Sequence, residues 1–221
     1  MEETGMTLNI GVIGATGMAG SAITKEAIER GLRVTAFVRN ESKAKDMFSD
    51  NAAYIVKDVF DIQKGDIADL DVLVDAFATH DVSQAYKHVD LAARLVELAK
   101  GSDKPRLFFI LGAASLETPD GQHLLDKLLK IPNNESFIDV PRQQAKEYEL
   151  LKNTTGVNWV AVSPSSTFKR GDAAEYTLGN NKLLTNAAGK SEITSGTMAK
   201  VILDEIQKPA HHNERFTAVN K

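Results

Sequence analysis

The stretch NIGVIGATGMAG, residues 9–20, joins an apolar run to three glycines at three-residue spacing. The apolar run predicts a buried strand, and a segment with helical periodicity follows it. Gly14 permits the tight turn between the two, Gly17 lets backbone amides approach a pyrophosphate, and Gly20 allows the helix to pack closely on the strand. No Gly-Lys-Ser/Thr follows, which excludes a Walker-type loop. This order favours a dinucleotide site over a glycine-rich turn without a ligand.

Short apolar segments rich in Val, Ile and Phe alternate with helical segments through the first half of the chain. This alternation predicts a parallel sheet covered by helices. We expect strands at residues 8–13, 32–38, 53–56, 72–78 and 106–111, and helices at about 18–30 and 83–100. Five such units in about 110 residues indicate an α/β fold of the Rossmann type, doubly wound and mostly parallel, with three α/β/α layers.

The pattern is looser in the second half of the chain. The turn clusters TPDG and IPNN flank one short apolar stretch, which predicts a loop with a short helix at residues 124–131. We expect a helix at 140–153, a strand at 159–162, an irregular stretch to about 191, a helix at 195–207 and a last strand at 216–219. Residues 1–221 are interpreted as a single NAD(P)-binding domain, with a substrate-facing lobe from about 112–140 and 163–192.

The composition excludes several classes of function. The net charge of -4 argues against a nucleic-acid surface, because such a surface must neutralise many phosphates. The absence of cysteine excludes disulfides and thiolate metal sites, and the five histidines show no HExxH spacing, so we expect no metal. The N-terminal MEETGM lacks the basic residues of a signal peptide, and no apolar run approaches the ~18 residues of a membrane span. We therefore expect a cytoplasmic protein with no membrane partner, either a monomer or a homodimer.

The residues after the second expected strand bear on which dinucleotide binds. An acidic residue there would hold the ribose 2′-hydroxyl, whereas an arginine would accommodate a 2′-phosphate. The sequence has Arg39, a permanently charged fork suited to phosphate, with Ser42 and Lys43 close by. This favours NADP(H) over NAD(H). Arg39 as a solvated surface charge remains the alternative, and Glu41 leaves NAD(H) tolerance open.

Several motifs together resemble one family. GATGMAG at 14–20, Arg39-Asn40, Asp58-Val59, GAASLE at 112–117 and WVAVSP at 159–164 are similar to motifs of the atypical short-chain dehydrogenase/reductases. Within them the chain resembles small bacterial NADH-flavin reductase-like proteins of the NAD(P)H-binding family, and more distantly the biliverdin-IXβ/flavin reductases. The resemblance covers nearly the whole chain.

The resemblance implies one cofactor site along the carboxyl ends of the strands. The glycine turn would bind the pyrophosphate, Arg39 the 2′-phosphate, and the segments after the later strands the adenine, ribose and nicotinamide. The cofactor-binding residues expected in this way are Gly14, Ala15, Thr16, Gly17, Met18, Ala19, Gly20, Arg39, Asp58, Val59, Ala76, Phe77, Gly112, Ala113, Ser163, Pro164, Ser165 and Thr167.

The candidate catalytic side chain is Ser115, placed nearest the reacting rings as a hydrogen-bond donor. Its alternative is a serine that satisfies local backbone in a turn. Tyr148 and Lys152 match the Tyr-x-x-x-Lys spacing of typical short-chain dehydrogenases. Counting from Ser163-Pro164 instead places the family positions near Asp139 and Gln143, so we expect Tyr148 to pack and Lys152 to be solvated.

Without a catalytic Tyr-x-x-x-Lys pair, the sequence favours a reaction that needs no proton-donating side chain. We expect an NAD(P)H-dependent reductase, an oxidoreductase that passes hydride to a flavin, quinone or similar flat conjugated acceptor, with orientation providing much of the catalysis. A non-enzymatic NADP(H)-sensing regulator is the alternative. An NAD-dependent epimerase/dehydratase relative is a third reading. A measurement of cofactor oxidation distinguishes the reductase from the sensor, because a sensor binds the cofactor without oxidising it.

Overall fold

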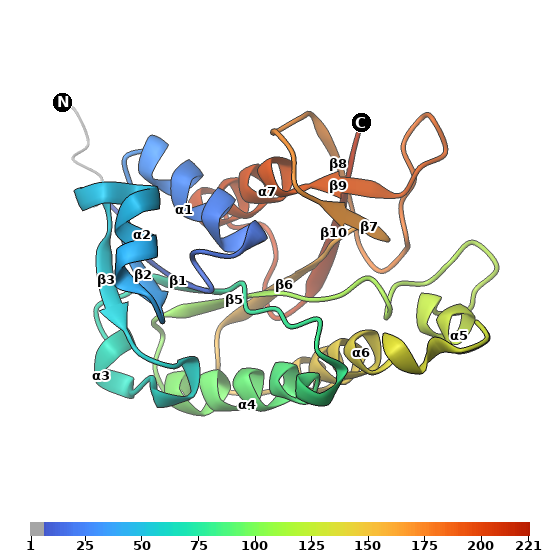
Figure 1. Cartoon of the computed structure of the whole chain (residues 1–221), viewed down its shortest axis with the longest axis horizontal. Helices are drawn as coiled ribbons and strands as arrows, with labels where there is room; N and C mark the ends of the chain where they lie inside the picture. Colours follow the sequence, from blue (N-terminus) through green and yellow to red (C-terminus); the bar gives the residue numbers. More distant parts are fainter. Residues whose placement is uncertain (1–6) are drawn as a thin grey trace.

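A single sheet of eight strands runs through the molecule, in the order β3-β2-β1-β4-β5-β6-β10-β8 (Figure 1). The computed structural model describes residues 7–221, so the interpretation of MEETGM concerns residues outside the described range. Only β8 is antiparallel to its neighbour among these eight strands. The strands are β1 (Asn9–Ile13), β2 (Arg33–Val38), β3 (Ala53–Val56), β4 (Val72–Asp75), β5 (Arg106–Ile110), β6 (Trp159–Ser163), β8 (Tyr176–Gly179) and β10 (Arg215–Asn220). The order confirms the predicted doubly wound Rossmann-like fold.

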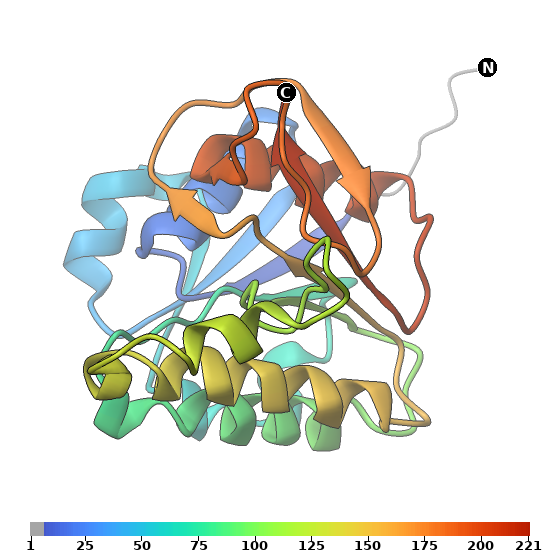
Figure 2. The same cartoon turned by 90° about the vertical axis from the view of Figure 1, so that its right-hand side faces the viewer.

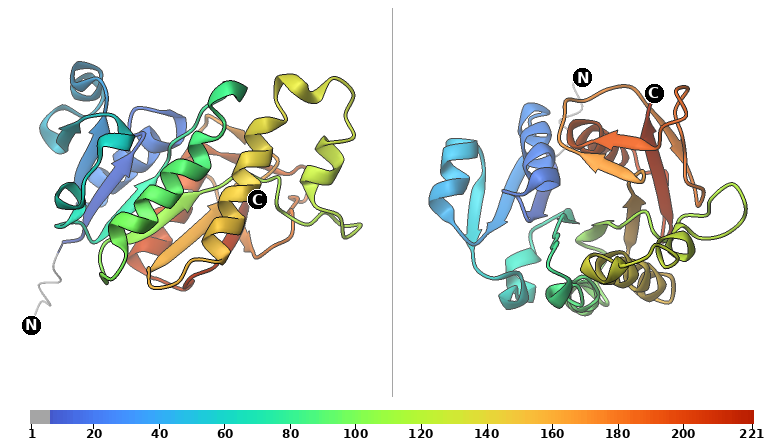
Figure 3. Two further views of the ribbon diagram at one scale, coloured as in Figure 1. Left: turned by 90° about the horizontal axis from the view of Figure 1, so that it is seen from below. Right: turned by 45° about the vertical axis from the view of Figure 1, so that its right-hand side comes forward.

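Helices cover both faces of the sheet (Figures 1 and 2). On one face lie α1 (Met18–Glu29), α2 (Glu41–Phe48) and α7 (Ser195–Gln207). On the other lie α3 (Lys64–Ile67), α4 (Lys87–Ala99) and α6 (Asp139–Lys152), with α4 and α6 side by side (Figure 3). The short α5 (Leu124–Leu128) lies beyond them. Among the described helices, none is long and apolar enough to cross a membrane.

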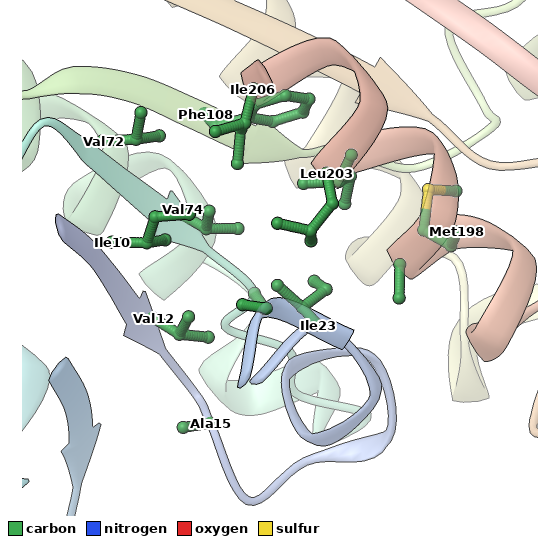
Figure 4. Packing of buried hydrophobic residues seen from close by; sticks show 14 of the residues in the cluster. Ile10, Val12, Ala15, Ile23, Val72, Val74, Phe108, Met198, Leu203 and Ile206 are labelled. Atoms are coloured by element: carbon green, nitrogen blue, oxygen red, sulfur yellow. The ribbon is translucent and has the colours of Figure 1, made fainter. Parts of the chain in front are cut away.

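Two apolar clusters, one on each face, hold the layers together. On the first face Ile10 and Val12 of β1 pack with Ile23 of α1 and Leu203 of α7 (Figure 4). On the second face α4 and α6 pack over a cluster that includes the fully buried Trp159. Each strand of the centre thus buries both of its faces, which explains why the strands read as continuous apolar runs.

Several local expectations differ from the structure: the helix expected at 83–100 begins at Lys87, and α3 is not among the expected helices. The fourth strand ends at Asp75 instead of residue 78, because the Asp75 carboxylate accepts the Phe77 N–H at 2.9 Å and turns the chain. The stretch to residue 191 is not wholly irregular: it contains β8 and also β7 (Thr167–Lys169), which pairs in parallel with β9 (Glu192–Thr194). The helix α2, whose N-terminus Asn40 caps by accepting the Lys43 N–H, is not among the expected elements.

Candidate functional site

The glycine turn between β1 and α1 is tightly closed. Gly14 has φ +70°, and its carbonyl accepts the Gly17 N–H at 2.9 Å. A Cβ on Gly14 would lie 2.7 Å from the Ala76 oxygen, and one on Gly20 would lie 2.1 Å from the Gly14 oxygen. These backbone approaches require glycine at both positions, so the turn, the helix and the loop after β4 fit together only without side chains there.

The N-terminus of α1 opens toward this turn. Gly17 is the N-cap, no side chain caps it, and the first turn holds no acidic residue. The unpaired backbone amides and the positive end of the helix dipole suit an anionic group. The chemistry of this cradle fits the pyrophosphate of a dinucleotide.

A cleft of about 620 Å³ extends from this turn along the carboxyl ends of the parallel strands. It is lined by Gly14, Thr16, Gly17, Met18, Ala19, Phe37, Val38, Arg39, Lys43, Lys57, Asp58, Val59, Phe60, Ala76, Phe77, Ala78, His80, Lys87, Ile110, Leu111, Gly112, Ala113, Gln144, Pro164, Ser165, Ser166 and Phe168. Ligands of open α/β sheets bind in this position.

One end of the cleft is basic. Arg39 follows β2 and Lys43 lies in the first turn of α2, and no described residue pairs with the Arg39 guanidinium. Lys57 follows β3, but its Nζ lies 2.7 Å from Asp66 Oδ2, and this contact lowers the pKa of the Asp66 carboxyl. Among the described residues, Arg39, Lys43 and Lys87 line the cleft without an ion pair, and Lys87 lies over the Phe60 ring, 5.9 Å from its centroid. Arg39 and Lys43 are therefore the cations next to β2 and α2 with capacity left for a phosphate.

The other end, which we call the acceptor end, is formed by the lining residues after β5 and β6 and by α6: Ile110, Leu111, Gly112, Ala113, Gln144, Pro164, Ser165, Ser166 and Phe168. None of these side chains is titratable. The Ser165 hydroxyl donates to the Ala218 oxygen and the Ser166 hydroxyl to the Ser191 oxygen. What remains at this end is apolar surface, backbone and one amide.

That amide belongs to Gln144, which the sequence reasoning missed. A Cβ on Gly112 would lie 2.3 Å from Gln144 Oε1, so the amide packs directly over the Gly112 backbone. No residue in the described part of the chain hydrogen-bonds the Gln144 side chain. The register count considered the neighbouring Gln143 only as the position of the family's lysine, so no sequence signal singled out Gln144.

Most of the expected cofactor residues come together in the cleft. Those that line it are Gly14, Thr16, Gly17, Met18, Ala19, Arg39, Asp58, Val59, Ala76, Phe77, Gly112, Ala113, Pro164 and Ser165. Ala15, Gly20, Ser163 and Thr167 do not line it: Ala15 and Ser163 are fully buried, and Gly20 packs against the turn. Their roles in binding stay predictions. Gly20 and Ser163 lie behind the residues that line the cleft and would act through them.

The candidate Ser115 also does not line the cleft. It is buried, and its Oγ accepts from Arg215 Nη1 at 2.9 Å. Tyr148 lies outside the lining as well, with its hydroxyl donating to Asn181 Oδ1 at 3.4 Å. Lys152 forms an ion pair with Glu149 at 2.7 Å. Catalytic roles for Ser115 and for Tyr148 remain untested by this arrangement.

Buried titratable groups lie near the loop after β4. Burial raises the pKa of Asp75 to about 7, and burial together with the nearby Asp75 raises the pKa of Glu147 well above its usual value. Burial lowers the pKa of His88 to about 4, and its Nδ1 lies 3.9 Å from Glu147 Oε2. At neutral pH His88 is therefore neutral, Glu147 holds a proton that a solvated carboxyl would have lost, and Asp75 is only partly ionised.

Asp75→Asn is expected to stabilise the protein at high pH. Because the pKa of Asp75 is higher in the folded protein, at about 7, than its ordinary 3.8, the parent protein loses stability as pH rises from about 4 to about 7. Asparagine keeps an oxygen for the Phe77 N–H and does not ionise. In urea unfolding, the free energy of unfolding of the variant relative to the parent should therefore be on the order of 3 kcal/mol more favourable at pH 8 than at pH 4.5.

Asp71→Asn is the matched control with the opposite sign. Asp71 accepts the Asn9 N–H at 2.8 Å and pairs with Lys104, and its pKa is lowered by these contacts in spite of partial burial. Its contribution to stability is present at neutral pH and lost in acid, so Asp71→Asn should be destabilising at pH 8. An Asp75→Asn advantage that does not grow with pH would contradict the buried, protonated carboxyl.

Fold, glycine cradle and cleft together define a protein of the NAD(P)-binding Rossmann-like class. The chain matches the model of the NAD(P)H-binding family over residues 14–209, and it belongs to that family. It is 34% identical over 219 residues to the protein YwnB of Bacillus subtilis (strain 168), covering 97% of this chain and 99% of that protein.

Solved structures agree with this membership. A protein from Lactobacillus casei matches with a TM-score of 0.89 and 37% identity, over 96% of this chain and 99% of its own. A protein of Streptococcus pneumoniae TIGR4, described as "a putative NADH-flavin reductase", matches with a TM-score of 0.87 and 31% identity, over 97% of this chain and 100% of its own. The predicted relationship to NADH-flavin reductase-like proteins is thereby confirmed.

Proposed function

We propose that this protein is an NAD(P)H-dependent reductase that passes hydride to a flavin, a quinone or a similar flat conjugated acceptor. The observation that carries the proposal is that one cleft contains both the glycine turn and the acceptor end. The side chains that line the acceptor end are not titratable. Bound NAD(P)H would supply the hydride from nicotinamide C4. The chain's own residues would hold the two rings at reacting distance, and hydride transfer of this kind needs no protein acid.

The lining of the acceptor end supports a flat, apolar acceptor. Ile110, Pro164 and Phe168 provide apolar surface, and the Gln144 amide provides an NH₂ group that donates hydrogen bonds and an oxygen that accepts them. Six of the residues at this end fall within the expected substrate-facing lobe, about 112–140 and 163–192, whereas Ile110, Leu111 and Gln144 lie outside it. The name of the Streptococcus pneumoniae relative points to the same class of acceptor.

The basic end supports NADP(H) as the preferred cofactor. Arg39 and Lys43 lie together in the cleft, where a 2′-phosphate on the adenosine ribose would meet two cations with no competing carboxylate contact in the described part of the chain.

A turnover assay tests the proposal. Purified protein is mixed anaerobically with NADPH or NADH and a panel of free flavins and quinones, and cofactor absorbance is followed. We expect saturable oxidation with at least one acceptor and a higher kcat/KM for NADPH. NADPH binding without oxidation by any acceptor would overturn the reductase and favour the NADP(H)-sensing regulator instead.

A further inference from the structure

Arg215 is a buried cation that has no carboxylate partner among residues 7–221. It begins β10 and is only 4% exposed. Its Nη1 donates to Ser115 Oγ at 2.9 Å and Ser163 Oγ at 3.0 Å, and its Nε and Nη2 donate to Asn181 Oδ1 at 3.1 and 2.9 Å. The ring of Tyr148 lies over it, 4.2 Å from Cζ. Every one of these partners is neutral.

A second buried arginine, in contrast, has a carboxylate partner. Arg106, 6% exposed, pairs with Glu205 at 2.8 Å. In the described part of the chain, no Asp or Glu forms an ion pair with Arg215. Burial lowers the pKa of its guanidinium, but the pKa of an arginine is so high that the group stays charged. A buried charge without a counter-charge is costly. Its retention here points to a role for positive charge at this place.

Hydrogen bonds connect this charge to the acceptor end. Ser163 accepts from Arg215 and donates to the Gly112 oxygen at 2.9 Å. The Gly112–Ala113 peptide is trans, so the Ala113 N–H points away from Ser163. Both residues line the acceptor end, and no described residue accepts the Ala113 N–H. Charge at one end of such a chain of hydrogen bonds strengthens the donor at the other.

We propose that Arg215 is a positioning residue which, through Ser163, makes the Ala113 N–H a charge-assisted donor to a carbonyl oxygen of the acceptor. The inference rests on the proposed reductase function and narrows its substrates to conjugated rings that carry a carbonyl beside the reduced position. In the transfer, the C4–H bond breaks with both electrons and a new bond joins that hydrogen to the acceptor. The cofactor is oxidised, the acceptor gains one negative charge, and a solvent proton later neutralises it. The buried guanidinium stabilises that negative charge.

Arg215→Met, Arg215→Lys and Ser163→Ala test this inference. Arg215→Met should lower kcat for a carbonyl acceptor about 30-fold, somewhat less than the loss of a direct oxyanion donor. The Kd for NADPH and the KM for the acceptor should stay within about threefold, because the charge acts on the transition state. Arg215→Lys keeps the charge and should recover most of kcat. Ser163→Ala, which leaves Arg215 in place, should lower kcat about tenfold.

Arg106→Lys is the matched control for disturbing a buried arginine, and it should lower the melting temperature without lowering kcat. If Arg215→Met fails to fold, Ser163→Ala decides the question alone. Folded variants that keep the parent kcat, or an Arg215→Lys protein no better than Arg215→Met, would overturn the inference. Failure of the parent to oxidise NADPH with any acceptor would instead overturn the proposed function.

Discussion

Gly20→Ala is expected to raise the Kd for NADPH at least about 100-fold. The added Cβ would lie 2.1 Å from the Gly14 oxygen, 2.7 Å from the Gly14 carbonyl carbon and 3.0 Å from the Ala15 Cα, all of them backbone atoms. Helix α1 must therefore move away from the turn, and its unpaired amides move with it. A misplacement on the order of 1 Å costs about 10²-fold in the rate of an enzyme, and we expect a loss of the same order when the amides that hold a pyrophosphate move. Fluorescence titration with NADPH measures the loss.

Gly31→Ala is the matched control, since Gly31 ends the same helix at φ +73° with no atom within 4 Å of an added Cβ. It should cost about 1 kcal/mol of stability and leave the Kd unchanged. Tight NADPH binding by a folded Gly20→Ala protein would show that the dinucleotide does not bind at this turn.

Arg39→Asp is expected to raise the Kd for NADPH about 50-fold and to change the Kd for NADH less than threefold. The substitution replaces a cation with a carboxylate at the basic end of the cleft, where it would repel a 2′-phosphate and could accept from a ribose 2′-hydroxyl. A loss of about 50-fold corresponds to about 2.3 kcal/mol, which is reasonable for one charge-assisted contact. Parallel titrations with the two cofactors measure it.

Lys45→Asp is the control for net charge. Lys45 lies on α2, pairs with Glu41 at 2.7 Å and does not line the cleft. It should affect both cofactors alike and weakly, because solvent screens a charge at this distance. Equal losses of NADPH and NADH with Arg39→Asp would remove the assignment of Arg39 to the 2′-phosphate.

The fold and the part of the cleft around the glycine turn could be predicted from sequence because their signals are local. The glycine spacing at 14–20 and the apolar runs each determine a neighbouring turn or strand, so β3 at Ala53–Val56 and α7 at Ser195–Gln207 have the predicted bounds. The family motifs then placed most cofactor residues in the observed cleft. Local signals of this kind are least affected by long-range packing.

The acceptor end could not be predicted in the same way, because its geometry depends on contacts between distant segments. Ser115 is held by Arg215, one hundred positions later, and Gln144 reaches Gly112 from another helix. The short strands β7 and β8 carry mixed polar and apolar residues and form only against β9 and β10. Residue type and spacing do not show such partners, whereas tertiary context decides them.

Direct hydride transfer within the cleft is the central claim, and a single-turnover isotope experiment tests it most directly. NADPH deuterated stereospecifically at either face of nicotinamide C4 is mixed anaerobically with the protein and its best flavin or quinone acceptor, and cofactor oxidation is followed by stopped flow. In the proposed reaction the cleft holds the two rings in one orientation. Deuterium on one face should therefore slow the step about twofold or more, and deuterium on the other face should leave it unchanged. Equal rates with both labels would contradict the account, and so would NADPH that binds and is never oxidised.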